Sequence, residues 1–136
     1  MSREQVNGRR WRCIDDGPLP GRENMERDEQ LLAEAASGSA LPVLRLYGWS
    51  PPAVSLGRFQ EEDRAVDRGA CRARGIDIVR RVTGGRAVLH NEELTYSIVA
   101  PAGGDLFPND VIGTYKVIAE GLLAGLRELG VPAEPA

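Results

Sequence analysis

Apolar and polar positions along the chain repeat with two periods, one typical of helices and one typical of strands. The clearest helical repeat lies near the end, and its apolar members are Val111, Ile112, Tyr115, Ile118, Ala119, Leu122, Leu123, Leu126 and Leu129. Asn109 or Asp110 can cap the start of this helix, and Gly130 with Pro132 ends it. This segment is therefore predicted to be a long amphipathic helix.

Three glycines interrupt this long helical repeat, at positions Gly113, Gly121 and Gly125. A glycine inside a helix costs about 1 kcal/mol relative to alanine, because it loses more backbone freedom on folding. We therefore expect another element to pack closely against the backbone of this helix.

Two earlier segments also have the character of helices. Residues 24–37 (NMERDEQLLAEAAS) begin with Asn24, a good N-cap residue, and are followed by Gly38, which can end a helix. Residues 61–75 (EEDRAVDRGACRARG) predict a weaker helix, because Gly69 lies inside it.

Strands are predicted where apolar residues alternate or form short runs bounded by turn residues. Four segments have this pattern, and Ser50-Pro51-Pro52 separates the first two: residues 42–49, 53–57, 76–83 and 94–100. The order of elements is thus helix, strands, helix, strands, helix. It predicts an α+β fold with a mixed, largely antiparallel sheet flanked by helices.

Length and composition predict one domain, with residues 1–10 as a polar tail and residues 11–136 as the folded portion. The 136-residue chain is 42% apolar, and its net charge of −3 gives no overall attraction to nucleic acid. No apolar run reaches 18 residues, and the charged start lacks the apolar stretch of a secretion signal. We expect a cytoplasmic protein without a membrane span.

Few residues offer nucleophilic or metal-binding chemistry. Cys13 and Cys71 are far apart and form no CxxC or Cys/His cluster, so neither a disulfide framework nor a metal site is expected. Cys71 is predicted to be a small buried residue of the 61–75 helix. Of the 17 basic residues only Lys116 is a lysine, so any reaction that needs an amine must use Lys116 or a group outside this chain.

Residues 80–90 (RRVTGGRAVLH) combine three arginines, two adjacent glycines and the only histidine. In the simplest interpretation Gly84 and Gly85 form a hairpin turn, since glycine accepts the positive φ of tight turns. The arginines would then be solvated, and His90 would lie at the end of a strand.

A binding site is the alternative for the same segment. Arg80 and Arg81 are neighbours in a strand and point to opposite faces, so whichever points inward needs an anionic partner. No acidic residue lies between Arg80 and His90 to provide one. The glycines also leave backbone N–H groups open to a carboxylate, a phosphate or a developing oxyanion. The segment matches neither GxxxxGK[ST] nor GxGxxG, which argues against those nucleotide-binding folds.

The segment RRVTGGRAVLHNEELTYSIVAP resembles the signature of the lipoate–protein ligase and octanoyltransferase family, which is related to the biotin protein ligase catalytic domain. The resemblance continues through WRCIDDG, NMERDEQLL, LRLYGWSPPAVSLGRFQ and CRARGIDIVRR, and covers about residues 11–130. It implies an α+β fold in which an acyl chain lies in a tunnel beside the glycine turn. TGGRAVLH followed by ELTYS is closest to the octanoyltransferases, because ligases tend to have a third glycine at the position of Arg86.

By resemblance, eight residues would line the acyl and head-group site: Arg81, Thr83, Gly84, Gly85, Arg86, Ala87, Val88 and His90. Asn91 stands where the family commonly has an aspartate, which weakens any acid role there. The family's catalytic cysteine and lysine lie downstream of the long helix, and Cys13, Cys71 and Lys116 match neither. No catalytic residue is therefore assigned in this chain, and we expect it to be the N-terminal portion of a longer catalytic domain.

The resemblance implies transfer of an octanoyl group from acyl carrier protein to a lysine of lipoyl domains or of the glycine-cleavage H protein, without a cofactor. Two alternatives stay open. One is a fragment of an ATP-dependent lipoate–protein ligase, which would use ATP and magnesium. The other is a non-catalytic acyl-binding half of a two-chain enzyme, completed by a missing C-terminal half.

Overall fold

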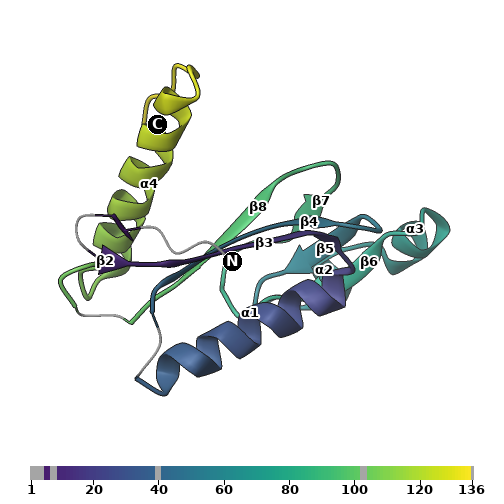
Figure 1. The fold of residues 1–136 in the computed structure, drawn as a ribbon. Helices are drawn as coiled ribbons and strands as arrows, with labels where there is room; N and C mark the ends of the chain where they lie inside the picture. Colours follow the sequence, from purple (N-terminus) through teal and green to yellow (C-terminus); the bar gives the residue numbers. More distant parts are fainter. Residues whose placement is uncertain (1–4, 7–8, 39–40, 102–103, 136) are drawn as a thin grey trace. The chain divides into compact units, whose positions relative to one another are not determined.

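The computed structural model describes residues 5–6, 9–38, 41–101 and 104–135 (Figure 1). The chain divides into two compact units, Met1–Ala100 and Pro101–Ala136. The first unit contains all the strands and the first three helices, and the second contains the last helix. The expected α+β fold with mixed sheets flanked by helices is confirmed.

One three-stranded sheet has the order β3-β4-β8, with β3 at Arg12–Leu19, β4 at Val43–Trp49 and β8 at Thr95–Val99. β4 is its centre, parallel to β3 and antiparallel to β8. The strands predicted at residues 42–49 and 94–100 are thus confirmed, whereas β3 was not predicted.

The buried face of β4 explains why β3 has little strand character in its sequence. Arg45 on this face is fully buried, and its Nε donates to Asp16 Oδ2 of β3 at 2.6 Å. Its other nitrogens donate to Asp28 Oδ1 at 2.9 Å and Asn24 Oδ1 at 2.7 Å. A buried charge needs such partners, so β3 carries Asp16, a residue type that a propensity-based prediction assigns to loops.

A tyrosine completes this buried charge network. The Tyr47 hydroxyl donates to Asp28 Oδ2 at 3.2 Å, and the Arg45 guanidinium lies 3.9 Å from the centre of the Tyr47 ring. Burial and the nearby Asp28 carboxylate raise the pKa of Tyr47 above its ordinary value. The phenol is therefore held as a neutral donor.

The second three-stranded sheet has the order β6-β5-β7, with β5 at Ala53–Leu56, β6 at Asp77–Arg80 and β7 at Val88–His90. β5 is the centre, parallel to β6 and antiparallel to β7. The hairpin interpretation of Gly84-Gly85 is therefore wrong, because β6 and β7 do not pair with each other. The segment between them crosses over the end of β5 instead.

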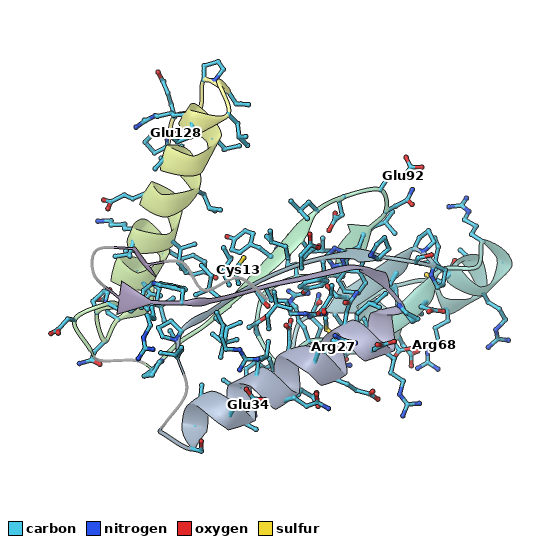
Figure 2. The ribbon with its side chains drawn as sticks, in the orientation of Figure 1. Cys13, Arg27, Glu34, Arg68, Glu92 and Glu128 are labelled. Atoms are coloured by element: carbon cyan, nitrogen blue, oxygen red, sulfur yellow. The ribbon has the colours of Figure 1, made fainter. Side chains whose placement is uncertain are left out.

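The first helix, α1 at Gly21–Ala36, packs against β4, β6 and β8 (Figure 1). It begins three residues before the predicted start, so the N-cap prediction for Asn24 is wrong. Asn24 is instead buried inside the helix and donates to the Gly48 carbonyl at 2.8 Å. Arg27, labelled in Figure 2, donates from α1 to Asp16 Oδ1 at 2.7 Å, which ties the helix to β3.

The segment predicted as one helix at residues 61–75 forms two short helices, α2 at Glu62–Ala65 and α3 at Arg68–Ala73. The break falls at Val66 and Asp67, both with extended backbone, and the Asp67 side chain accepts the Ala70 N–H as an N-cap. Cys71 is buried against the core formed with Val54 and Leu56, as predicted.

The predicted tail contains a short antiparallel ladder between β1 at Gln5–Val6 and β2 at Arg9–Arg10. Residues 1–4 and 7–8 of that tail lie outside the described part of the chain.

The second unit is built on α4, at Val111–Glu128. Its predicted start is confirmed, because the Asp110 side chain accepts the Gly113 N–H at 2.6 Å. Gly130 has the left-handed conformation of a helix end, with φ of 76°. A Cβ at Gly121 or Gly125 would meet no atom within 4 Å in the described part of the chain. The predicted close packing against these glycines is therefore not found within the described residues of the second unit.

Replacing Gly121 with alanine should raise the stability of α4 by up to about 1 kcal/mol, because alanine is the better helix former and space is open. Helix content measured by circular dichroism during thermal unfolding would show this. A lower midpoint than that of the wild-type chain would instead indicate an element packed on this face.

Candidate functional site

The candidate site is the loop of residues 81–87, here called the glycine loop, which crosses the end of β5. The Thr83 carbonyl accepts the Arg58 N–H at 2.9 Å, and the Arg81 N–H donates to the Leu56 carbonyl at 3.0 Å. A Cβ on Gly57 would lie 2.0 Å from the Gly85 carbonyl oxygen. Only a glycine at position 57 therefore lets the loop lie this close to β5.

The Arg81 side chain holds the glycine loop in place through hydrogen bonds. Its Nη2 donates to the carbonyls of Gly84 at 2.8 Å and Arg86 at 2.7 Å. Its Nη1 donates to the Ser55 carbonyl at 2.8 Å and to Ser55 Oγ at 3.0 Å. One guanidinium thus joins the centre of the β5 sheet to two peptide groups of the loop.

This contact fixes the direction of the loop amides. Ser50–Pro51 is the single cis peptide bond of the described residues, so the peptide groups of the loop are trans, with N–H opposite to C=O. The Gly84 and Arg86 carbonyls point at Arg81, and the Gly85 carbonyl lies against Gly57. The following N–H groups therefore point away from these partners: those of Gly85 and Ala87 away from the Arg81 guanidinium, and that of Arg86 away from Gly57.

The charge of Arg81 makes these backbone N–H groups better hydrogen-bond donors to an anion. The Arg81 cation sits at the carbonyl ends of two peptide dipoles, so their N–H ends present positive potential on the other side. Gly85 has a left-handed φ of 93°, a conformation that side chains rarely allow. Adjacent backbone N–H groups that converge on one point can bind a phosphate or an oxyanion.

Arg80 also finds its partners among carbonyl groups. Its Nη1 donates to the carbonyls of Gly57 at 2.9 Å and Gln60 at 2.7 Å, with a longer contact to Arg58 at 3.4 Å. The expectation that the inward-pointing arginine needs an anionic partner is therefore wrong. Backbone carbonyls satisfy Arg80 and Arg81, because a guanidinium spreads its charge over five N–H donors.

Seven of the eight predicted site residues form one continuous strip. Its exposed members are Thr83, Gly84, Gly85, Arg86 and Val88, and its half-buried members are Arg81 and Ala87. A Cβ on Gly84 would meet no atom within 4 Å, so the outer side of the strip borders open space. His90, the eighth, is buried behind the strip rather than lining it.

The buried His90 ring is held on three sides. Its Nε2 lies 2.8 Å from Ser55 Oγ, and its Nδ1 lies 2.5 Å from Glu93 Oε1. The ring stacks on Trp49 with 4.0 Å between centroids and 8° between planes. Glu92, at the outer end of the β7–β8 connection in Figure 2, has a left-handed φ of 49° in the bend that brings Glu93 back to the ring.

Hydrogen bonds keep the Glu93 carboxylate charged. Partial burial would raise the pKa of Glu93, but hydrogen bonds from Thr95 and His90 and the charge of His90 outweigh this, and the pKa is lowered. Thr95 Oγ1 donates to Glu93 Oε1 at 2.7 Å and itself accepts the Trp49 Nε1–H at 2.8 Å. Glu93 is thus an ionised acceptor at neutral pH.

The residue pattern did not reveal three residues of this cluster: Ser55, Gly57 and Glu93. The signal for Ser55 was weak but present, since it is the only polar residue between Ala53 and Leu56. Gly57 and Glu93 carry no such signal, because their importance comes from Gly85 and His90, which are distant in sequence.

Two open hollows, of about 560 and 480 Å³, lie around α2, α3 and β6 and contain none of the predicted site residues. Within the described residues no cluster of three or more His, Cys, Asp or Glu could hold a metal ion. The described chain also contains no helix long and apolar enough to cross a membrane.

The family of lipoyl protein ligase A/B catalytic domains matches residues 20–136, and the chain belongs to this family. The family resemblance is thereby confirmed.

Two relatives show where the chain lies within the family. It is 52% identical over 123 residues to the octanoyltransferase LipM of Symbiobacterium thermophilum. The aligned region covers 90% of this chain and 44% of the relative. It is 45% identical over 129 residues to LipM of an Exiguobacterium strain, and the aligned region covers 95% of this chain and 47% of that relative. The chain therefore spans about half the length of the curated relatives it matches.

Solved structures of lipoate–protein ligases share the fold of this chain. A lipoate–protein ligase A structure bound with ATP superposes with a TM-score of 0.77 at 29% identity, covering 92% of this chain and 49% of that one. The bi-partite lipoate protein ligase of Thermoplasma acidophilum, described with its E2 lipoyl domain, superposes with a TM-score of 0.71 at 28% identity. The superposition covers 92% of this chain and 48% of that one.

Proposed function

We propose that this chain is the acyl-binding portion of an octanoyltransferase of protein lipoylation. The observation that carries the proposal is the glycine loop, whose carbonyls face Arg81 and Gly57 and whose N–H groups face the opposite way. In the proposed complex an octanoyl thioester lies along the loop, with its carbonyl oxygen on the amides of Gly85, Arg86 and Ala87. The high identity to octanoyltransferases over most of the chain supports this assignment.

These amides would stabilise the charge that develops when the acyl carbon reacts. When a nucleophile attacks a thioester, negative charge develops on the carbonyl oxygen, and fixed N–H donors stabilise that charge more than the neutral carbonyl. Arg81 strengthens the effect because its charge aligns the peptide dipoles behind the oxygen. The loop would therefore act as an oxyanion site.

The remaining predicted site residues would bind the two ends of the substrate. Val88, 44% exposed beside the loop, offers apolar surface to the acyl chain, where full burial is worth about 0.8 kcal/mol per methylene. Thr83 and the exposed Arg86 guanidinium lie at the open side and would bind the head group, including a phosphate on the arm of acyl carrier protein.

The transfer itself needs a thiolate that takes the octanoyl group and a lysine that assists it, and we propose that both lie outside residues 1–136. Cys71 supports this because it is buried in the core, and Cys13 because it lies in β3 of the other sheet. The acyl donor is proposed to be octanoyl acyl carrier protein, and the acceptor a lysine of a lipoyl domain or of the glycine-cleavage H protein.

Nuclear magnetic resonance titration of the 136-residue chain with octanoyl-N-acetylcysteamine, a soluble thioester, tests the binding step. We expect the amide signals of Gly84, Gly85, Arg86 and Ala87 to move together, and the butanoyl analogue to bind more weakly. Four fewer methylenes remove at most about 3 kcal/mol of transfer free energy.

Titration of the same chain with N-acetylcysteamine alone provides the control, since it lacks the acyl group. Saturating octanoyl thioester that leaves these four amides unmoved would contradict the proposed site.

An ATP-dependent ligase is the second candidate, favoured by the superposition on a ligase bound with ATP. In that case ATP with magnesium and lipoate, rather than the thioester, would move the loop amides, and the completed enzyme would exchange pyrophosphate into ATP. The bi-partite ligase of T. acidophilum also keeps a two-chain arrangement as an alternative. Co-purification of a second chain carrying the cysteine and lysine would favour that arrangement.

A further inference from the structure

Four side chains from separate parts of the first unit form one continuous hydrogen-bonded chain behind the glycine loop. It runs from Arg81 Nη1 to Ser55 Oγ at 3.0 Å, from Ser55 Oγ to His90 Nε2 at 2.8 Å, and from His90 Nδ1 to Glu93 Oε1 at 2.5 Å. It joins the start of the glycine loop, the central strand β5, the end of β7 and the β7–β8 connection.

The fixed roles of the two end groups limit how hydrogens can be placed along this chain. Glu93, as a carboxylate, can only accept, so His90 carries a proton on Nδ1. Arg81 can only donate, so Ser55 Oγ accepts from it and can donate its own hydrogen to His90 Nε2 when that nitrogen carries no proton. Nδ1 of His90 is thus a donor to Glu93, and Nε2 faces Ser55 Oγ.

The spacing is close to that of a catalytic serine, histidine and carboxylate, but the environment differs. Ser55 is 2% exposed in the central strand of its sheet, so no substrate carbonyl can reach its hydroxyl. Its oxygen also accepts the Arg81 hydrogen bond, which lowers its nucleophilicity. His90 Nε2 is occupied by Ser55 and cannot serve as a base for an external group.

We propose that His90 is a positioning residue of the candidate site, acting through Ser55 to hold the Arg81 guanidinium that orients the glycine-loop amides. The inference rests on the proposed function for the identity of the ligand. Trp49 supports it by fixing the ring plane, since it stacks on His90 and also holds Thr95 against Glu93.

His90 is the only histidine, so a long-range proton–nitrogen spectrum of the labelled chain contains a single imidazole. We expect this spectrum to show a proton on Nδ1, the nitrogen that faces the Glu93 carboxylate. This measurement needs no variant. An imidazole carrying its proton on Nε2 would overturn the proposal.

Two variants with a matched control test whether the chain acts on the loop. In Glu93→Ala the Nδ1 proton loses its acceptor, so we expect the tautomer to change, the Gly84 and Gly85 amide signals to move, and the Kd for octanoyl-N-acetylcysteamine to rise about tenfold. Glu93→Gln keeps an acceptor oxygen and should restore most of the affinity. Glu92→Ala removes the adjacent exposed carboxylate and should change none of these.

The outcomes separate this inference from the proposed function. If the wild-type chain binds no thioester, the proposed function fails, while the tautomer and the Gly84 and Gly85 signals still decide the role of His90. If Glu93→Ala changes the tautomer but leaves those glycine signals and the thioester affinity in place, the positioning role is wrong. A lower melting temperature with an unchanged tautomer would indicate a structural role alone and would also overturn it.

Discussion

Replacing Arg45 with alanine should lower the free energy of unfolding by about 3–5 kcal/mol, because it leaves two acidic side chains without their shared buried cation. The Arg45 side chain is fully buried, and those of Asp16 and Asp28 are 12% and 16% exposed. Water can therefore compensate these carboxylates only in part. Arg45→Lys should also lose most of this stability, because an ammonium cannot reproduce the planar fork of donors that Arg45 directs at Asp16, Asp28 and Asn24.

Urea unfolding followed by far-ultraviolet circular dichroism would measure the effect of Arg45→Ala. Arg22→Ala is the matched control, since it also removes an ion pair, that with Glu26, but from a side chain that is 87% exposed. Surface pairs of this kind contribute about 0–1 kcal/mol, so the control should unfold close to the wild-type chain. Equal midpoints for the two variants would contradict a stabilising role of the buried network.

The second large effect is expected for Gly57→Ala, which should weaken binding of octanoyl-N-acetylcysteamine at least about tenfold. The new Cβ would lie 2.0 Å from the Gly85 carbonyl oxygen and 2.9 Å from its carbonyl carbon, so the loop must move away from β5. Overpacking against backbone costs about 1–3 kcal/mol, and the displacement would also draw the Gly84 and Arg86 carbonyls away from Arg81. The outward amides would then lose their fixed direction.

Gly69→Ala is the matched control for this variant, because its Cβ would have one neighbour, Asp67 Oδ1 at 3.3 Å, in the described chain. It also lies in α3, outside the candidate site. Thioester affinity by titration calorimetry and the signals of Gly84 and Gly85 would be compared in the two variants. Wild-type affinity in Gly57→Ala would show that the position of the loop against β5 does not matter for binding.

Together these variants separate two tasks of arginine in this protein. Arg45 holds the first sheet and α1 together through acidic side chains, whereas Arg81 holds the glycine loop through carbonyl groups. A protein with a single lysine among its 17 basic residues uses guanidinium groups for both, because they donate in several directions at once.

The sequence by itself determined most of the secondary structure and the family. The strands around Leu44, Val54 and Ile98, and the helix capped by Asp110, follow from local periodicity and turn residues, so they could be predicted without contacts. The glycine loop was also found from its sequence, because two adjacent glycines among arginines are locally unusual.

The tertiary structure alone decided what depends on partners distant in the chain. β3 could not be predicted because Asp16 lies in it as a partner of the distant Arg45. Local spacing favours a hairpin at Gly84-Gly85, because only the strand order shows β5 between β6 and β7. The anionic partner expected for the arginines proved to be backbone carbonyls for the same reason. Local sequence patterns indicate which elements form. The packing of the whole unit determines which groups hydrogen-bond to its buried polar side chains.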